Sequence, residues 1–136
     1  MQYNTSIDNN TATNIVFDGA DVYDTDGFHS PSSNNTQIII PAGKGGKYLI
    51  VFNGSWAANT TGRRRYLLQL NGSTGRAGVD FVGGGDTSEG TQYQTFSVVR
   101  NLNVADYIEI RAYQNSGGGL NLYADDVRFE LTYLGA

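Results

Sequence analysis

The segment ADVYDTDGFHSP, residues 20–31, combines three aspartates with the only histidine of the chain, His29. A calcium ion takes about six to eight oxygen ligands in a protein, and closely spaced carboxylates supply several of them at once. Asp21, Asp24 and Asp26 could therefore contribute to a calcium site. A histidine beside carboxylates could also serve as a general base.

The same segment has the residue types of a tight turn. Aligning Gly27 with the invariant glycine of an EF-hand loop places Val22 at the first ligand position and Ser33 at the twelfth, so that pattern is not met. We favour an Asx-capped turn in which Gly27 is left-handed and Tyr23 and Phe28 pack inward. Calcium binding is kept as the alternative.

Catalysis lacks a recognisable set of partner residues. No nucleophile elbow or second metal-binding histidine accompanies His29, and the chain has no cysteine. A glycosidase would need two carboxylates at a set separation, and nothing selects a pair. Glu109 and Glu130, for example, fall on alternating strands, where outward solvated positions are the default. We predict a protein that is not an enzyme and needs no cofactor.

The triplet RRR is the only basic cluster. Arg63, Arg64 and Arg65 could grip an acidic partner or extend into solvent at the start of a strand, and both interpretations stay open. Nucleic acid is not an expected partner, because the formal net charge is −4, the pI is near 4.7, and one triplet releases few counterions.

The composition indicates a single all-β domain. The chain has 136 residues, and its 18 glycines and 9 tyrosines are typical of aromatic-rich strands joined by tight turns. No apolar run approaches the ~18–20 residues that span a bilayer, so we expect no membrane partner. The start, MQYNTSIDNNTATN, has neither the basic nor the apolar region of a signal peptide.

Apolar residues recur with a period of two, and no 12-residue window keeps helical spacing. Segment 47–57 is apolar on both faces, so it should be a central strand covered on both sides, or covered on one side by another subunit. Segment 105–114 alternates most cleanly, with Tyr107 and Tyr113 outward. The predicted strands are 36–41, 47–57, 63–72, 76–82, 92–102, 105–114 and 126–134.

The two ends of the predicted sandwich carry its other features. Residues 1–13 have little apolar pattern, and we expect a flexible arm that a partner orders through Tyr3 and Ile7, ahead of a domain at 14–136. Exposed aromatics and the loops 57–62, 83–91 and 115–119 could bind a sugar. The candidate ligand residues there are Trp56, Asn59, Asp86, Glu89 and Asn115.

Five segments follow one another in a distinctive order: NIVFDGADVYDTDGFH (14–29), IIIPAGKGGKYLIVFNGSW (38–56), YLLQLNG (66–72), SVVRNLNVADYIEIRAYQNSGGGLNL (97–122) and FELTYLG (129–135). This order resembles the jelly roll of the tumour necrosis factor and complement globular-head superfamily, in the version found in bacteriophage virion proteins. The resemblance implies an antiparallel β-sandwich of about eight to ten strands. It also implies a homotrimer, for which we expect interface residues Tyr48, Tyr107, Tyr113, Tyr133 and Leu134.

From this resemblance we expect a virion structural protein on the outer capsid surface, made in the host cytoplasm. It would be a capsid decoration or cement protein, or a short head fibre, that binds the coat lattice as a trimer and stabilises it. Its partners would be its own copies and the major capsid protein or another virion protein. The Met-initiated, one-domain chain favours a stand-alone decoration protein over a fibre domain. The alternative is a receptor- or carbohydrate-binding head of a phage tail or fibre, with a host surface glycan as partner.

Overall fold

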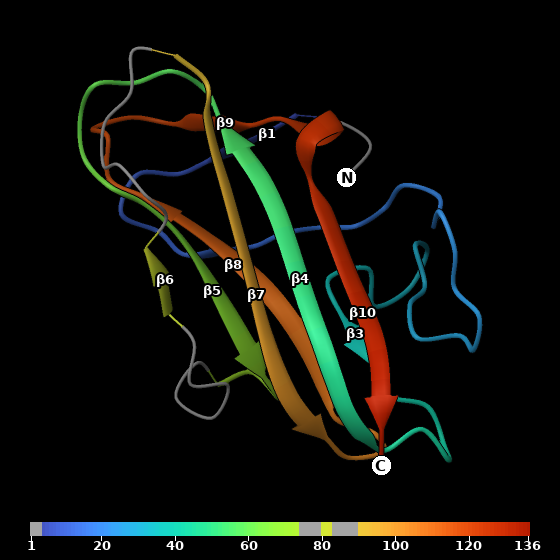
Figure 1. Ribbon diagram of the computed structural model, residues 1–136. Helices are drawn as coiled ribbons and strands as arrows, with labels where there is room; N and C mark the ends of the chain where they lie inside the picture. The colour runs from blue at the N-terminus through green and yellow to red at the C-terminus, as the bar shows by residue number, and fades with distance from the viewer. Residues whose placement is uncertain (1–3, 74–79, 83–89) are drawn as a thin grey trace.

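The computed structural model describes residues 4–73, 80–82 and 90–136 of the chain. Within them, two five-stranded antiparallel sheets pack face to face, and the only helical element is a single 3-10 turn, η1 (Ala124–Asp126). Figure 1 shows the long strands of one sheet in front of those of the other. The predicted all-β sandwich is confirmed.

The first sheet is built around one long strand. Its members are β1 (Thr5–Ile7), β4 (Gly46–Trp56), β7 (Gln92–Leu102), β9 (Leu120–Leu122) and β10 (Arg128–Gly135). The strand β4 pairs with β7 along one side and with β10 along the other. The strand β10 pairs with no further strand of the described chain, so it forms an edge of this sheet.

The second sheet is centred on β8. Its members are β2 (Thr13–Asn14), β3 (Ile38–Ile39), β5 (Arg64–Leu70), β6 (Asp80–Val82) and β8 (Tyr107–Gln114). The strand β8 pairs with β5 along its length and with the short strands β2 and β3 on its other side. The strands β2 and β3 have only two residues each, which is too few for a period of two to be seen in the sequence. The sequence pattern therefore indicated β3 only as part of a longer strand, 36–41.

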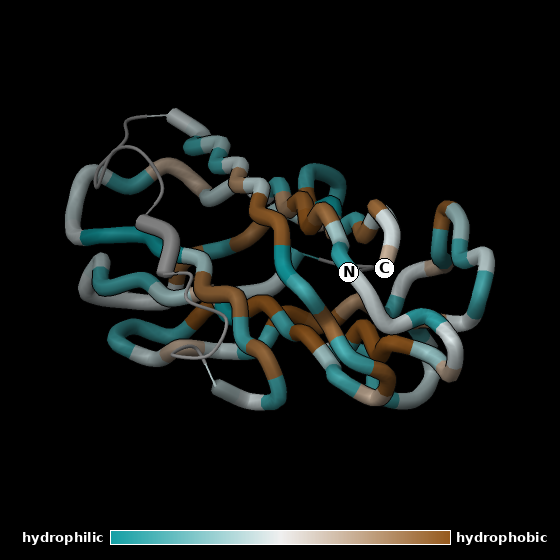
Figure 2. Tube along the Cα trace, turned by 60° about the horizontal axis from the view of Figure 1, so that its bottom comes forward, coloured by the Kyte–Doolittle hydropathy of each residue, from teal (hydrophilic) through white to brown (hydrophobic). Residues whose placement is uncertain are grey.

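Strand β4 has the central position that its two-faced pattern predicts. Tyr48, Ile50 and Phe52 point into the sandwich and are fully buried, whereas Leu49 and Val51 point outward and are half-buried. Apolar side chains fill the space between the sheets. In Figure 2 the brown stretches mark where hydrophobic residues lie along the chain. Successive side chains of a strand point to opposite faces of the sheet. Strand β4 therefore contributes side chains to this core and also presents aliphatic side chains on its other face.

The structure corrects the flexible arm expected at residues 1–13. Residues 5–7 form β1, which pairs with β9, and Ile7 is only 1% exposed in the core. The side-chain amide of Gln114 donates a 2.8 Å hydrogen bond to the carbonyl of Ile7. The segment is therefore held by backbone pairing and one buried side chain, neither of which produces a visible apolar period. Tyr3 lies outside the described residues.

Candidate functional site

The turn at residues 24–29 is built on one carboxylate. Asp24 Oδ1 accepts hydrogen bonds from the backbone N–H groups of Gly27 (2.9 Å) and Phe28 (3.0 Å), and its Oδ2 accepts one from His29 (3.0 Å). Gly27 has a φ of +74°, the left-handed conformation predicted for it. Burial alone would raise the pKa of Asp24, but the backbone hydrogen bonds, led by that of Phe28, outweigh it and lower the pKa below its ordinary value.

The three aspartates of this segment do not converge. Asp21 Oδ1 lies 2.8 Å from His29 Nδ1, and Asp26 Oδ2 lies 3.0 Å from Lys44 Nζ. Each aspartate therefore has a different partner: Asp21 binds His29, Asp24 caps the turn, and Asp26 pairs with Lys44. Among residues 4–73, 80–82 and 90–136, no group of three or more acidic, histidine or cysteine side chains is placed to hold a metal ion. The Asx-capped turn is confirmed, and the three carboxylates do not come together in the described chain.

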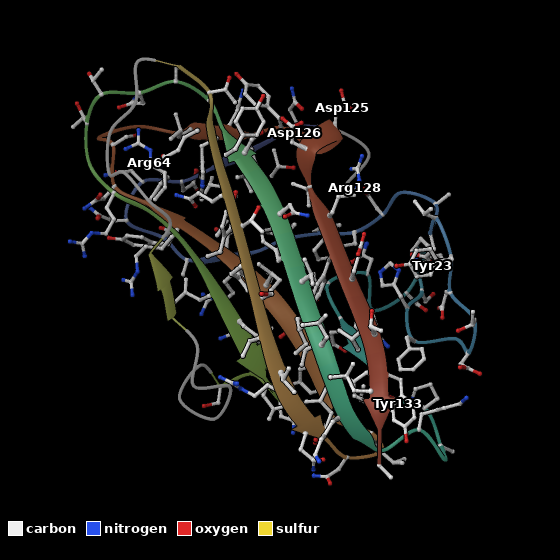
Figure 3. The ribbon with its side chains drawn as sticks, in the orientation of Figure 1. Tyr23, Arg64, Asp125, Asp126, Arg128 and Tyr133 are labelled. Carbon is white, nitrogen blue, oxygen red and sulfur yellow. The ribbon has the colours of Figure 1, made fainter. Side chains whose placement is uncertain are left out.

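The two aromatic residues of the turn behave differently from each other. Phe28 packs against the core with its ring 6.0 Å from that of Tyr48, as predicted. Tyr23 was expected to pack inward but is 62% exposed, so that prediction is wrong. It follows Val22, which is also exposed, at the tip of the loop. In Figure 3 Tyr23 lies on this loop, beside the sheet edge formed by β10.

His29 lies under this loop with one ring nitrogen engaged. Its side chain is only 8% exposed, and its ring meets that of Phe17 edge-on at 6.4 Å. A carboxylate can only accept, so the bond to Asp21 assigns the proton to Nδ1 and, in the neutral ring, leaves Nε2 as an acceptor. Nε2 is buried and has no hydrogen-bond partner in the described chain.

A groove of about 360 Å³ separates this loop from strand β10. We call it the β10 groove. Aromatic rings, aliphatic side chains and charged groups line it together. Its lining comprises Phe17, Gly19, Ala20, Asp21, Val22, Tyr23, Asp24, Thr25, Phe28, His29, Ile38, Ala124, Val127, Arg128, Phe129, Glu130 and Leu131. The sequence pattern did not indicate this groove, because its two walls are about 100 residues apart along the chain.

The outward face of β4, β7 and β10 is a second candidate surface. Leu49 is directly opposite Val99 of β7 on one side and Thr132 of β10 on the other. Val51, one step along the same face, lies between Ser97 and a glutamate of β10. Aliphatic side chains therefore meet near the middle of this face, beside Glu130 of β10, and we call the surface the open face. Tyr93, 69% exposed, lies at one end of β7.

The expected interface residues are spread over both sheets. Tyr48 is buried, and its hydroxyl donates to the carbonyl of Lys44, so it has no surface left for another chain. Tyr107 and Tyr113 belong to the other sheet, away from the open face. Tyr133 and Leu134 are about half exposed at the end of β10. One interface cannot use all five residues. The sequence signal for the open face was the two-sided apolar pattern of segment 47–57.

The three arginines have three different environments. Arg64 is only 1% exposed, which corrects its expected role as a partner contact. Its guanidinium donates to the carbonyls of Asn59 (2.8 Å), Thr61 (2.6 Å) and Gly62 (2.7 Å), so it holds the 59–62 loop from inside. Arg65 stacks over the ring of Tyr113 at 5.7 Å, whereas Arg63 is exposed.

The aromatic residue expected to bind a sugar, Trp56, is not on the surface. Trp56 is fully buried, stacks on Tyr66 at 5.5 Å and donates from Nε1 to Gln94. Asn115 accepts a 2.5 Å hydrogen bond from the backbone N–H of Arg63, and Asn59 accepts one from Thr61. Both asparagines thus shape the loops from within. Asp86 and Glu89 lie outside the described residues.

Glu109 is not the solvated residue that its outward position predicts. It is buried, and its Oε1 accepts hydrogen bonds from the side chains of Asn14 (3.1 Å) and Thr36 (2.8 Å). The carboxylate therefore connects β8 to two segments that cover the second sheet. Local sequence patterns could not indicate this, since both donors are more than 70 residues away along the chain.

Comparison with known proteins supports the fold alone. No family model matches the chain, and no curated protein matches its sequence. Among solved structures, the globular domain of zebrafish complement 1qA protein is similar, with a TM-score of 0.59 and 14% identity over 98% of each chain. The chain therefore has a jelly roll like that of the complement globular heads. No described helix is long and apolar enough to cross a bilayer.

Proposed function

We propose that this chain is a non-enzymatic assembly protein that forms a homotrimer through the open face. The observation that carries the proposal is the cluster of outward aliphatic side chains at Leu49, Val51 and Val99, in the middle of the longest strands. Two sheets already bury a complete core, so these residues are not needed for the fold of one chain. Exposed apolar positions grouped on a flat sheet are typical of subunit interfaces.

The proposal extends to a virion role on the resemblance described above. A trimer that binds across junctions between coat subunits on the outer capsid would add stability by mass action, as a decoration or cement protein or a short head fibre does. The low fraction of charged residues in the chain, 16%, is compatible with this role. A glycan platform at the 57–62 and 115–119 loops is not proposed, because Trp56 is buried.

The test is the solution mass of paired variants. Val99 and Val104 are almost equally exposed, at 49% and 48%, but only Val99 lies on the open face. The wild type and Val104→Glu are expected to have the mass of three chains by light scattering, and Val99→Glu that of one chain with an unchanged circular dichroism spectrum. A monomeric wild type, or a trimer that tolerates Val99→Glu, would overturn the proposed interface.

The virion role has its own test. If the proposal is correct, mass spectrometry of purified virus particles from the source of this chain will detect it. Added Val104→Glu protein will bind particles that lack it, whereas monomeric Val99→Glu protein will bind them weakly because its contacts are no longer multivalent. Particles that never contain the chain would refute the virion role and leave the trimer intact.

A further inference from the structure

The β10 groove lies beside an unpaired strand edge. In the described chain β10 pairs only with β4, and residues 127–131 form the wall of the groove on that free side. An edge strand carries backbone N–H and C=O groups that can pair with an added extended segment. The exposed Tyr23 stands on the opposite wall, on the loop that Figure 3 shows next to β10.

The charges that line the groove favour a cation. Asp21, Asp24 and Glu130 are carboxylates, and Arg128 is the only lysine or arginine among the lining residues. Three negative groups against one positive group give a net charge of −2 with His29 neutral. Arg128 Nη1 is directed toward the η1 turn, where it donates to the carbonyls of Asp125 (2.9 Å) and Val127 (3.0 Å).

His29 supplies a second and independent observation. Its Nε2, which accepts in the neutral ring, has no hydrogen-bond partner in the described chain, and its side chain is more than nine-tenths buried among the lining residues. An unpaired buried acceptor is costly, and a donor brought to it by a bound segment would remove that cost. The carboxylates of Asp21 and Glu130 can also accept from a cationic side chain that enters the groove.

We propose that the β10 groove binds an extended basic segment of a partner protein. The segment would add to the edge of β10 through its backbone and place a lysine or arginine side chain among Asp21, Glu130 and His29. The exposed ring of Tyr23 would cover that cation from the other wall. An anion such as phosphate would meet net repulsion. This inference does not rest on the proposed trimer, because one chain supplies the whole groove.

The test uses a blocked, rhodamine-labelled heptapeptide of alternating threonine and lysine. Matched probes carry glutamine or glutamate in place of lysine, and maltoheptaose tests for a sugar site. Fluorescence anisotropy at low salt is expected to show tighter binding of the lysine peptide than of either matched peptide. Backbone amide NMR shifts on titration are expected in β10 and in the 21–29 loop.

Variants locate the binding site. Asp21→Asn and Glu130→Gln are each expected to weaken lysine-peptide binding roughly two- to fivefold, the value of an exposed ion pair. Asp8→Asn removes the same charge from an exposed position away from the groove lining and should change nothing. Light scattering on each variant separates a loss of trimer from a loss of binding. Equal weakening by Asp8→Asn, no shifts in β10, or maltoheptaose bound in the groove instead of the peptide would each overturn the proposal.

Discussion

Asp24 organises its turn by accepting hydrogen bonds from backbone groups within five residues of it in the described chain. The aspartate, the glycine three residues later and the phenylalanine after it are local signals, which is why this turn could be predicted from the sequence. The exposure of Tyr23 and the burial of Arg64 could not. Each depends on segments that only the complete fold brings near, so the residue type alone gave the wrong environment.

Replacing Asp24 should therefore cost more than replacing a neighbouring aspartate. Asp24→Ala leaves several backbone N–H groups without their acceptor, and we expect a loss of about 1–2 kcal/mol of unfolding free energy. Asp26→Ala removes the exposed ion pair with Lys44 and a long, exposed hydrogen bond from Thr25, so its loss should stay below about 1 kcal/mol. Urea unfolding of both variants measures the difference. Equal losses would show that the cap is unimportant.

The cap of Asp24 also has a predicted pH dependence. Because the folded-state pKa lies below the ordinary 3.8, the contribution of the carboxylate is complete above the unfolded pKa and is lost as the pH falls through the folded pKa. The difference in unfolding free energy between wild type and Asp24→Asn should then shrink as the pH is lowered below about 4. For the exposed-site control Val22→Ala, the difference should not vary. A constant Asp24→Asn difference down to acid pH would contradict the assigned hydrogen bonds.

At the scale of elements, the long strands were predictable and the short ones were not. The long strands are β4, β7, β8 and β10, each of eight or more residues. Apolar residues recur along them with a period of two, and this period predicts a strand. The strands β1 and β9 are three residues each, and β1 was expected to be part of an arm. Their pairing is decided by the backbone and by one or two buried side chains, for which a periodic pattern has too few positions.

The role of β1 can be tested with its buried side chain. Ile7→Ala removes core packing, and we expect a destabilisation of about 2–4 kcal/mol. Val22→Ala, at a position 90% exposed, should change the unfolding free energy by less than about 0.5 kcal/mol. Thermal or urea unfolding compares them. If Ile7→Ala were as mild as Val22→Ala, the segment would be the loose arm that the sequence pattern indicated.

In the core half of strand β4, only glycine fits at position 54. A Cβ at Gly54 would lie 2.5 Å from the hydroxyl oxygen of Tyr66, a buried ring whose hydroxyl has no hydrogen-bond partner in the described chain. Gly54→Ala should therefore destabilise the fold by about 1–3 kcal/mol through overpacking. Tyr66→Phe should be close to neutral, since it removes an unsatisfied hydroxyl, and should recover part of the loss in the double variant. Full additivity of the two changes in urea unfolding would rule out this contact.

At the scale of the molecule, the fold is more informative than any one motif. The sandwich was predictable because strand number, turn spacing and alternation all agree with it, and the similarity to a complement globular head supports it. The surfaces were harder to predict. Of the five residues expected in one interface, one is buried and two lie on the other sheet, because alternation gives the face of a strand but not which faces stay uncovered.

The proposed trimer makes one prediction that concerns the entire molecule. If folding is coupled to association through the open face, the midpoint of thermal unfolding must rise with protein concentration, because mass action favours the assembled state. The midpoint of Val99→Glu should be independent of concentration and should equal that of dilute wild type, since the substituted position is outside the core. Differential scanning calorimetry over a hundredfold range of concentration measures both. A wild-type midpoint that does not move would mean that each chain is stable alone, so that the open face would be left for a different partner.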